Sequence, residues 1–173
     1  MTSRDCVNWH RYLDAWIRPG LDELNWTDRN NYPVWGIVRT SPQEWSMYVN
    51  EHYRHPGVPV RLRRLSIRPY GFVSIRAGHA GGEMLTRPLA LGGSSLSINY
   101  STSAAGCIRV GVLREDGTTI PGYTEDDMED YYGDDLDARI RWNAGDLGPL
   151  TAHPLRLRFR LRDADIFAIR SVP

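Results

Sequence analysis

A strict alternation of apolar and charged residues constrains the fold of this chain more than any other feature. Across residues 155–162, leucine or phenylalanine occupies every odd position and arginine every even one. Successive side chains of a β-strand point to opposite faces, so the pattern predicts a half-buried strand with its apolar side chains facing a core. An α-helix would scatter the same apolar residues around its axis.

The same period of two recurs in shorter segments from about Val60 onward. Apolar residues alternate with others over 108–112, and the run leads into Glu115-Asp116-Gly117, which is typical of a hairpin turn. Four more runs predict short strands: 72–75, 96–100, 138–142 and 166–169. Clusters of Gly, Ser, Asp and Pro separate these runs, and no long segment has the helical period. We therefore predict an all-β protein, an antiparallel two-sheet β-sandwich of jelly-roll type.

The first 57 residues differ from the rest in their aromatic content. Five of the six tryptophans lie within the first 45 positions: Trp9, Trp16, Trp26, Trp35 and Trp45. Residues 35–40 and 44–50 predict two strands joined at Ser41-Pro42, whereas the best helical candidate, 12–24, is interrupted by Pro19-Gly20. We expect two parts, a Trp-rich extension over 1–57 and a β-sandwich over 58–173.

Two groups of short segments carry a resemblance to a known family. The first group is IRPGLD at 17–22, NW at 25–26, RNNY at 29–32 and WGIV at 35–38. The second is GFVSI at 71–75, GE at 82–83, TRPL at 86–89, IPGY at 120–123, GD at 133–134 and LRLRFRLRDAD at 155–165. Together they resemble the late propeller and the C-terminal β-sandwich of invertase-like and arabinanase-like glycoside hydrolases.

The resemblance implies a β-sandwich preceded by the end of a five-bladed propeller. Enzymes of that family carry their nucleophile and general acid on early propeller blades, and the resemblance covers only the last part of such proteins. We therefore expect that glycosidase activity is not inherited by this chain.

Charge and composition disfavour several classes of partner. The chain has 21 basic and 21 acidic residues, and every basic residue is arginine. This balance gives no global field for nucleic acid or an anionic membrane. Residues 1–16 contain no apolar signal region, and no run of 18 apolar residues follows. We expect a cytoplasmic protein with reduced Cys6 and Cys107, which lie in no metal-ligand spacing.

Five residues within a dozen positions form the candidate ligand site: Arg18, Asp22, Asn25, Trp26 and Arg29. They combine hydrogen-bond donors, an acceptor and a flat aromatic ring, which together bind sugars and other polyhydroxylated metabolites. The alternative is a structural loop that is closed by an ion pair between Arg18 and Asp22, with Trp26 packed in the core.

The densest acidic segment, 125–137, is a candidate cation site. Asp126, Asp127 and Asp134 offer the hard oxygen ligands that calcium prefers, although the EF-hand spacing is absent. A solvated acidic loop is the alternative, and no other cofactor is expected. For His52 and His55, the sequence favours a capping or packing role over binding a metal ion together.

These observations favour a small-ligand or carbohydrate-binding β-sandwich related to glycoside-hydrolase accessory modules. The alternative is a stand-alone biosynthetic enzyme, such as a cyclase, lyase or hydrolase, that uses Asp or Glu for acid–base chemistry in an aromatic-lined pocket. Strand edges left unpaired also predict a homodimer. A closed cavity with a buried carboxyl group of raised pKa would favour the enzyme, and an open aromatic groove would favour the binding protein.

Overall fold

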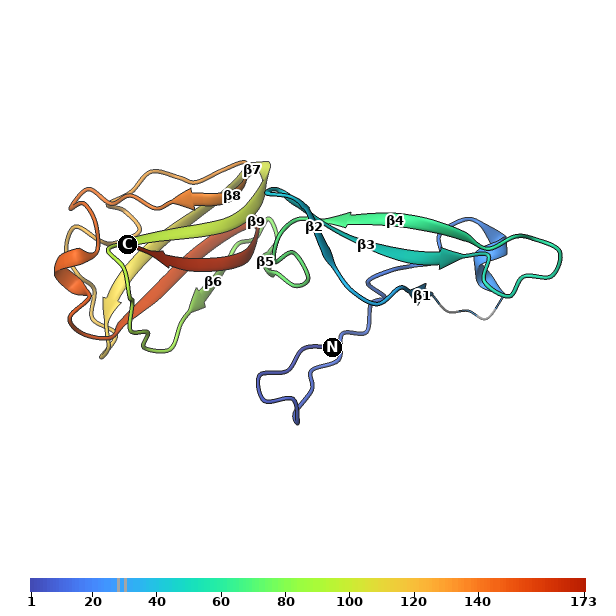
Figure 1. The fold of residues 1–173 in the computed structure, drawn as a ribbon. Coiled ribbons are helices and arrows are strands. Elements are labelled where there is room, and N and C mark those ends of the chain that lie inside the picture. The colour runs from blue at the N-terminus through green and yellow to red at the C-terminus, as the bar shows by residue number, and fades with distance from the viewer. Residues whose placement is uncertain (28, 30) are drawn as a thin grey trace. The chain divides into compact units, whose positions relative to one another are not determined.

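The computed structural model describes residues 1–27, 29 and 31–173, and it shows a chain of β-strands (Figure 1). Two antiparallel sheets belong to two compact units, residues 1–67 and 68–173. The helical segments of the described residues are two short 3-10 turns, η1 (Glu23–Trp26) and η2 (Gly148–Leu150). The prediction of an all-β protein with two antiparallel sheets is confirmed.

The N-terminal unit is a small sheet centred on β3 (Glu44–Glu51). On one side β3 pairs with β1 (Tyr32–Pro33) and β2 (Val38–Ser41), and on the other with β4 (Arg61–Ile67). The two strands expected around Ser41-Pro42 are present as β2 and β3. The sequence predicts a Trp-rich extension that ends at residue 57. Strand β4 follows that position and completes the first sheet, so the compact unit extends to Ile67.

Two long strands dominate the C-terminal unit, β7 (Ser95–Arg114) and β9 (Leu155–Val172). They pair with each other, β8 (Asp134–Arg139) flanks β7, and β5 (Ile75–Ala77) and β6 (Gly82–Leu85) flank β9. The strands expected at 72–75 and 138–142 overlap these strands only at one end. β5 begins at Ile75, where the first prediction ends, and β8 ends at Arg139, near the start of the second. In both cases pairing with a long neighbour, rather than local apolarity, sets the bounds.

Both long strands bend at one place. The pairing is interrupted between Thr102 and Cys107 of β7, opposite Asp163 of β9, whose φ is 45°. Gly106 lies at this corner, where a Cβ atom would be 2.4 Å from the carbonyl oxygen of Asp163, so only glycine allows the close approach. Figure 1 shows that the two halves of each strand lie in different layers, so the sheet folds over on itself as a sandwich.

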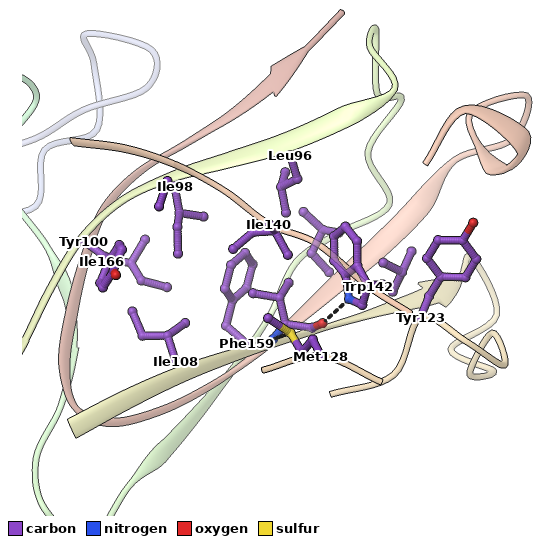
Figure 2. Close-up of a cluster of buried hydrophobic side chains, with 14 of the residues drawn as sticks. Leu96, Ile98, Tyr100, Ile108, Tyr123, Met128, Ile140, Trp142, Phe159 and Ile166 are labelled. Atoms are coloured by element: carbon purple, nitrogen blue, oxygen red, sulfur yellow. Dashed lines mark hydrogen bonds between the residues drawn. The ribbon is translucent and has the colours of Figure 1, made fainter. Parts of the chain in front are cut away.

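The core of the C-terminal unit fills the space between these layers (Figure 2). The predicted alternation is confirmed, since the apolar residues at 155, 157, 159 and 161 are at most 4% exposed. Past Asp163 the buried positions change phase to Ala164 and Ile166, since Asp163, with its positive φ, is unpaired at the bend. Trp142 closes one end of the core, where its indole N–H donates a hydrogen bond to the carbonyl oxygen of Val110.

The helical content also bears on membrane insertion. Neither 3-10 turn, nor any other helix within the described part of the chain, has the length and apolar character needed to cross a bilayer.

Candidate functional site

A cavity of about 270 Å³ lies in the N-terminal unit, between the chain segment around Trp16–Pro19 and one face of the sheet. Alternate residues of β3 and β4 supply its apolar wall: Met47, Val49, Leu65 and Ile67. Its polar lining comes from both sides: Arg18, Asn25 and Asn31 from the N-terminal segment, and Glu51 and Arg63 from the sheet. The cavity thus combines an indole ring, an apolar wall and several hydrogen-bonding groups.

Side-chain to backbone hydrogen bonds fold the segment that covers the cavity. Asp22 caps η1, because its Oδ1 accepts a hydrogen bond from the backbone N–H of Leu24 at 3.1 Å. The side chains of Asn25 and Trp26 reach back to the carbonyl oxygens of Pro19 and Gly20, at 3.2 and 2.9 Å. These bonds close a compact loop in which Asn25 is turned toward the cavity and the capped turn is fixed.

A buried histidine attaches this loop to the end of β3. His52 is 7% exposed, and its Nε2 lies 2.8 Å from Oδ2 of Asp22. The backbone N–H of His52 donates to Oδ1 of Asn25 at 3.0 Å, and Nη2 of Arg61 donates to Asp22 at 3.1 Å. The hydrogen bond from His52 is the largest of the effects that lower the pKa of Asp22, so this carboxylate is ionised at neutral pH.

Glu51 is the buried carboxylate of the cavity. Its side chain is 9% exposed, Arg61 Nε donates to Oε2 at 2.7 Å, and Arg63 Nη1 donates to Oε1 at 3.0 Å. Burial alone would raise the pKa of Glu51, but the hydrogen bonds and charges of Arg63 and Arg61 outweigh it, and the net shift is downward. Glu51 is therefore a fixed, ionised hydrogen-bond acceptor.

The five residues expected to form a ligand site have three different roles. Arg18 and Asn25 line the cavity, and Asp22 supports the loop from behind. Trp26 is 50% exposed and lies outside the cavity lining, as does Arg29, whose backbone N–H donates to the carbonyl oxygen of Trp26. Two of the five predicted side chains therefore line the cavity.

The alternative of a loop closed by an Arg18–Asp22 ion pair is wrong. Arg18 contacts Asp14 instead, at 3.5 Å, with both side chains largely exposed. Asp22 pairs with His52 and Arg61, which come from a later part of the chain. Trp26 is not in a core, because half of its surface is open to solvent.

Sequence reasoning missed Glu51 and Arg63. Glu51 lies on β3 and Arg63 on β4. Glu51 pairs directly with Arg61, and Arg63 pairs with Val49, two residues along β3. The signal was the glutamate directly after the predicted strand 44–50 and the Arg61-Leu62-Arg63 run in the next segment. Reading it required the strand register, which decides that both arginines share a face with Glu51.

The acidic segment of the C-terminal unit does not bring its predicted ligands together. Asp126 pairs with Arg109 at 3.4 Å, Asp134 with Arg68 at 2.8 Å, and Asp127 accepts a hydrogen bond from the backbone N–H of Thr124 at 2.9 Å. In the described ranges, no three His, Cys, Asp or Glu side chains form a group that could hold a metal ion. The geometry therefore gives no support to a calcium site at these residues.

Comparison with known proteins does not assign the chain to a class. No family model, no curated protein and no solved structure matches it. The resemblance to invertase-like and arabinanase-like proteins stays a prediction, and the function is argued from the site itself.

Proposed function

We propose that this protein binds a small polyhydroxylated ligand, a sugar or sugar acid, in the cavity of the N-terminal unit. The cavity volume of about 270 Å³ lies just below the range of about 300–1,000 Å³ that is usual for ligand pockets. A ligand of this volume has a single sugar ring. The proposal retains the carbohydrate-binding character expected from the sequence and locates it at the sheet face.

The fixed, ionised carboxylate of Glu51 is the observation that carries the proposal. Its carboxylate accepts hydrogen bonds from Arg61 and Arg63, so its position is fixed before any ligand enters. An ionised carboxylate beside a guanidinium group offers acceptors and donors to neighbouring hydroxyls of one sugar ring, and charge-assisted hydrogen bonds of this kind are strong. The ring of Trp16 and the wall of Met47 and Val49 suit the apolar C–H face of the sugar.

The ionised state of Glu51 argues against a role as a general acid. A cyclase, lyase or hydrolase that used Glu51 as a general acid would need its pKa raised toward neutrality. The arginines lower the pKa of Glu51 instead, so it carries no proton to donate near pH 7. We therefore propose a binding protein rather than the enzyme that the sequence left open.

Arg18 suggests that an acidic group on the ligand improves binding. It lines the cavity, and its contact with Asp14 is long and exposed, so the guanidinium remains available to a carboxylate. Arg63, by contrast, is engaged by Glu51. A sugar acid would place its ring against Trp16 and its carboxylate against Arg18.

Calorimetric titration of the full chain with D-glucose and D-glucuronate tests the proposal. We expect glucuronate to bind more tightly, and Arg18→Ala to weaken its binding about 10-fold, as the loss of one charge-assisted hydrogen bond would. Arg39→Ala, an exposed arginine of β2 outside the cavity lining, is the matched control. Equal affinity for glucuronate in the Arg18→Ala variant and the wild type would contradict the proposal, as would the absence of binding by either sugar.

A further inference from the structure

A second cavity lies in the C-terminal unit, and the ligand site proposed above does not include it. Its volume is about 480 Å³, and it is lined by Tyr100 of β7 together with residues 128–132 and 141–143. The last two segments flank β8 in sequence, so the chain passes the cavity once before this strand and once after it. The volume falls within the range of about 300–1,000 Å³ found for ligand pockets.

The floor of this cavity is part of the hydrophobic core. Tyr100, Met128 and Trp142 are 4%, 8% and 5% exposed, and Figure 2 shows them among the core side chains. The indole N–H of Trp142 is bonded to Val110, and the hydroxyl of Tyr100 donates to the carbonyl oxygen of Tyr132 at 2.9 Å. Since these polar atoms already have partners, the floor offers a rigid and largely apolar surface.

The rim, in contrast, carries exposed polar side chains. Glu129, Arg141 and Asn143 all line the cavity, and their side chains make no hydrogen bond or ion pair with another residue that the structure describes. Asp130, on the same rim, is engaged by Arg109. The ring of Tyr132 is 70% exposed and lies beside these groups in the lining. An acceptor, a set of donors, an amide and an open aromatic ring therefore surround one hollow.

We propose that this cavity is a second binding site, specific for an uncharged hydroxylated ring such as a neutral sugar. The charges of Glu129 and Arg141 offset each other, and Asp130 is already paired, so the rim has no excess charge that would select an ion of either sign. A hydroxyl group both donates and accepts, so neighbouring hydroxyls satisfy Glu129 and Arg141 together. The exposed face of Tyr132 covers the C–H face of the ring, as aromatic side chains do in sugar sites.

The site does not rest on the ligand proposed for the N-terminal unit. The two cavities belong to different units and share no residue. They also differ in charge, since Arg18 of the N-terminal cavity favours an acidic ligand, whereas the charges on the C-terminal rim offset each other. Each site can therefore fail or succeed in experiment without the other.

Titration of the full ¹⁵N-labelled chain with methyl β-D-glucoside, methyl β-D-galactoside and methyl β-D-xyloside tests this proposal by NMR. At least one of these neutral glycosides should shift the amide signals of 128–132 and 141–143, with affinity of about millimolar order. D-glucuronate and choline serve as the anionic and cationic probes. Stronger shifts at these amides with either charged probe would overturn the assignment of an uncharged ligand, and no shift with any glycoside would overturn the site.

Three variants test the rim. Glu129→Gln and Arg141→Ala should each weaken glycoside binding about 10-fold, because each removes a charge-assisted hydrogen bond. Tyr132→Ala should weaken it by a similar factor through loss of the ring contact. Glu115→Gln, at an exposed glutamate of the hairpin turn, is the matched control, and circular dichroism checks that each variant is folded. Unchanged binding in Glu129→Gln or Arg141→Ala would overturn the proposal, whereas Arg18→Ala should leave binding at this site unaffected.

Discussion

The two units of this protein are stabilised in different ways. The C-terminal unit buries one continuous apolar cluster that draws on β5, β7, β8 and β9. In the described part of the N-terminal unit, Met47 and Val49 are the only buried apolar side chains, and Ser46, Glu51 and His52 are buried beside them. A sheet with so little apolar burial depends on its charged and hydrogen-bonded contacts, which here join the N-terminal loop to β3 and β4.

The N-terminal unit also exposes large apolar side chains. Leu13, Leu21 and Trp35 are 97% or more exposed. The homodimer expected from the sequence stays a prediction, and light scattering that showed a monomer at high concentration would contradict it.

The largest effect should follow from removing the largest fully buried side chain of the C-terminal core. Phe159 is 0% exposed, so Phe159→Ala should lower the free energy of unfolding by about 3–5 kcal/mol, through lost burial and the cavity left behind. Denaturant unfolding, monitored by hydrogen exchange of peptides from each unit, measures this change in the free energy of unfolding. Leu85→Ala, at a half-exposed site on β6, is the control and should change stability by no more than about 0.5 kcal/mol.

A smaller effect is expected where a buried ion pair lies against a glycine. Glu125 is bonded to Arg158, and a Cβ atom on Gly111 would lie 2.6 Å from the carboxyl carbon of Glu125. Gly111→Ala should therefore displace the pair and cost about 1–3 kcal/mol. Gly92→Ala is the matched control, since open space surrounds that position. Equal stability of the two variants would show that Glu125 moves without cost.

Lowering the pH should destabilise the N-terminal unit before the C-terminal unit. The pKa values of Asp22 and Glu51 are lowered below their ordinary values of 3.8 and 4.5, so their contribution is complete above those values and is lost as the pH falls below them. Carboxylates of the C-terminal unit are affected too, but its apolar core does not titrate. Between pH 6 and pH 3, protection factors from hydrogen exchange, corrected for the intrinsic exchange rate at each pH, should fall first in 45–51 and 61–67. An earlier fall in protection in 155–161 would contradict the comparison.

The smallest effect is expected at an exposed aromatic residue. Trp35 is 99% exposed, so Trp35→Ser should change the free energy of unfolding by no more than about 0.5 kcal/mol. Its side chain contributes little to the fold of a single chain. A loss of several kcal/mol at low protein concentration would show that Trp35 packs within the chain, contrary to the structure.

Local patterns predicted much of the C-terminal unit. The alternation at 155–162 and at 108–112 identified strands, inward faces and the hairpin turn between 114 and 118, because side-chain direction in a strand follows from residue number alone. The pairing of β7 with β9 and their common bend could not be predicted in this way. The pairing and the bend depend on which distant segments of the chain meet. No local sequence pattern marks the change of buried phase at Asp163.

The candidate site was predicted less completely than the fold. The loop around Asp22 was recognisable from its mixture of polar and aromatic residues, but the partners of each side chain were not. Asp22 pairs with His52 rather than Arg18, because His52, directly after the end of β3, reaches the loop from thirty residues away in sequence. Glu51 and Arg63 needed the register of two strands, and the three predicted calcium ligands Asp126, Asp127 and Asp134 proved to have separate partners.

The pairing of β7 with β9 has a consequence for the order in which the C-terminal unit is made. Ser95 pairs with Val172 and Arg114 with Leu155, so the central ladder joins residues that are far apart in sequence. Such long-range pairing makes folding slow, commonly milliseconds to seconds. On the ribosome, β7 waits with one side unpaired until residues 155–172 emerge, and during that interval a chaperone or another strand can occupy its open edge.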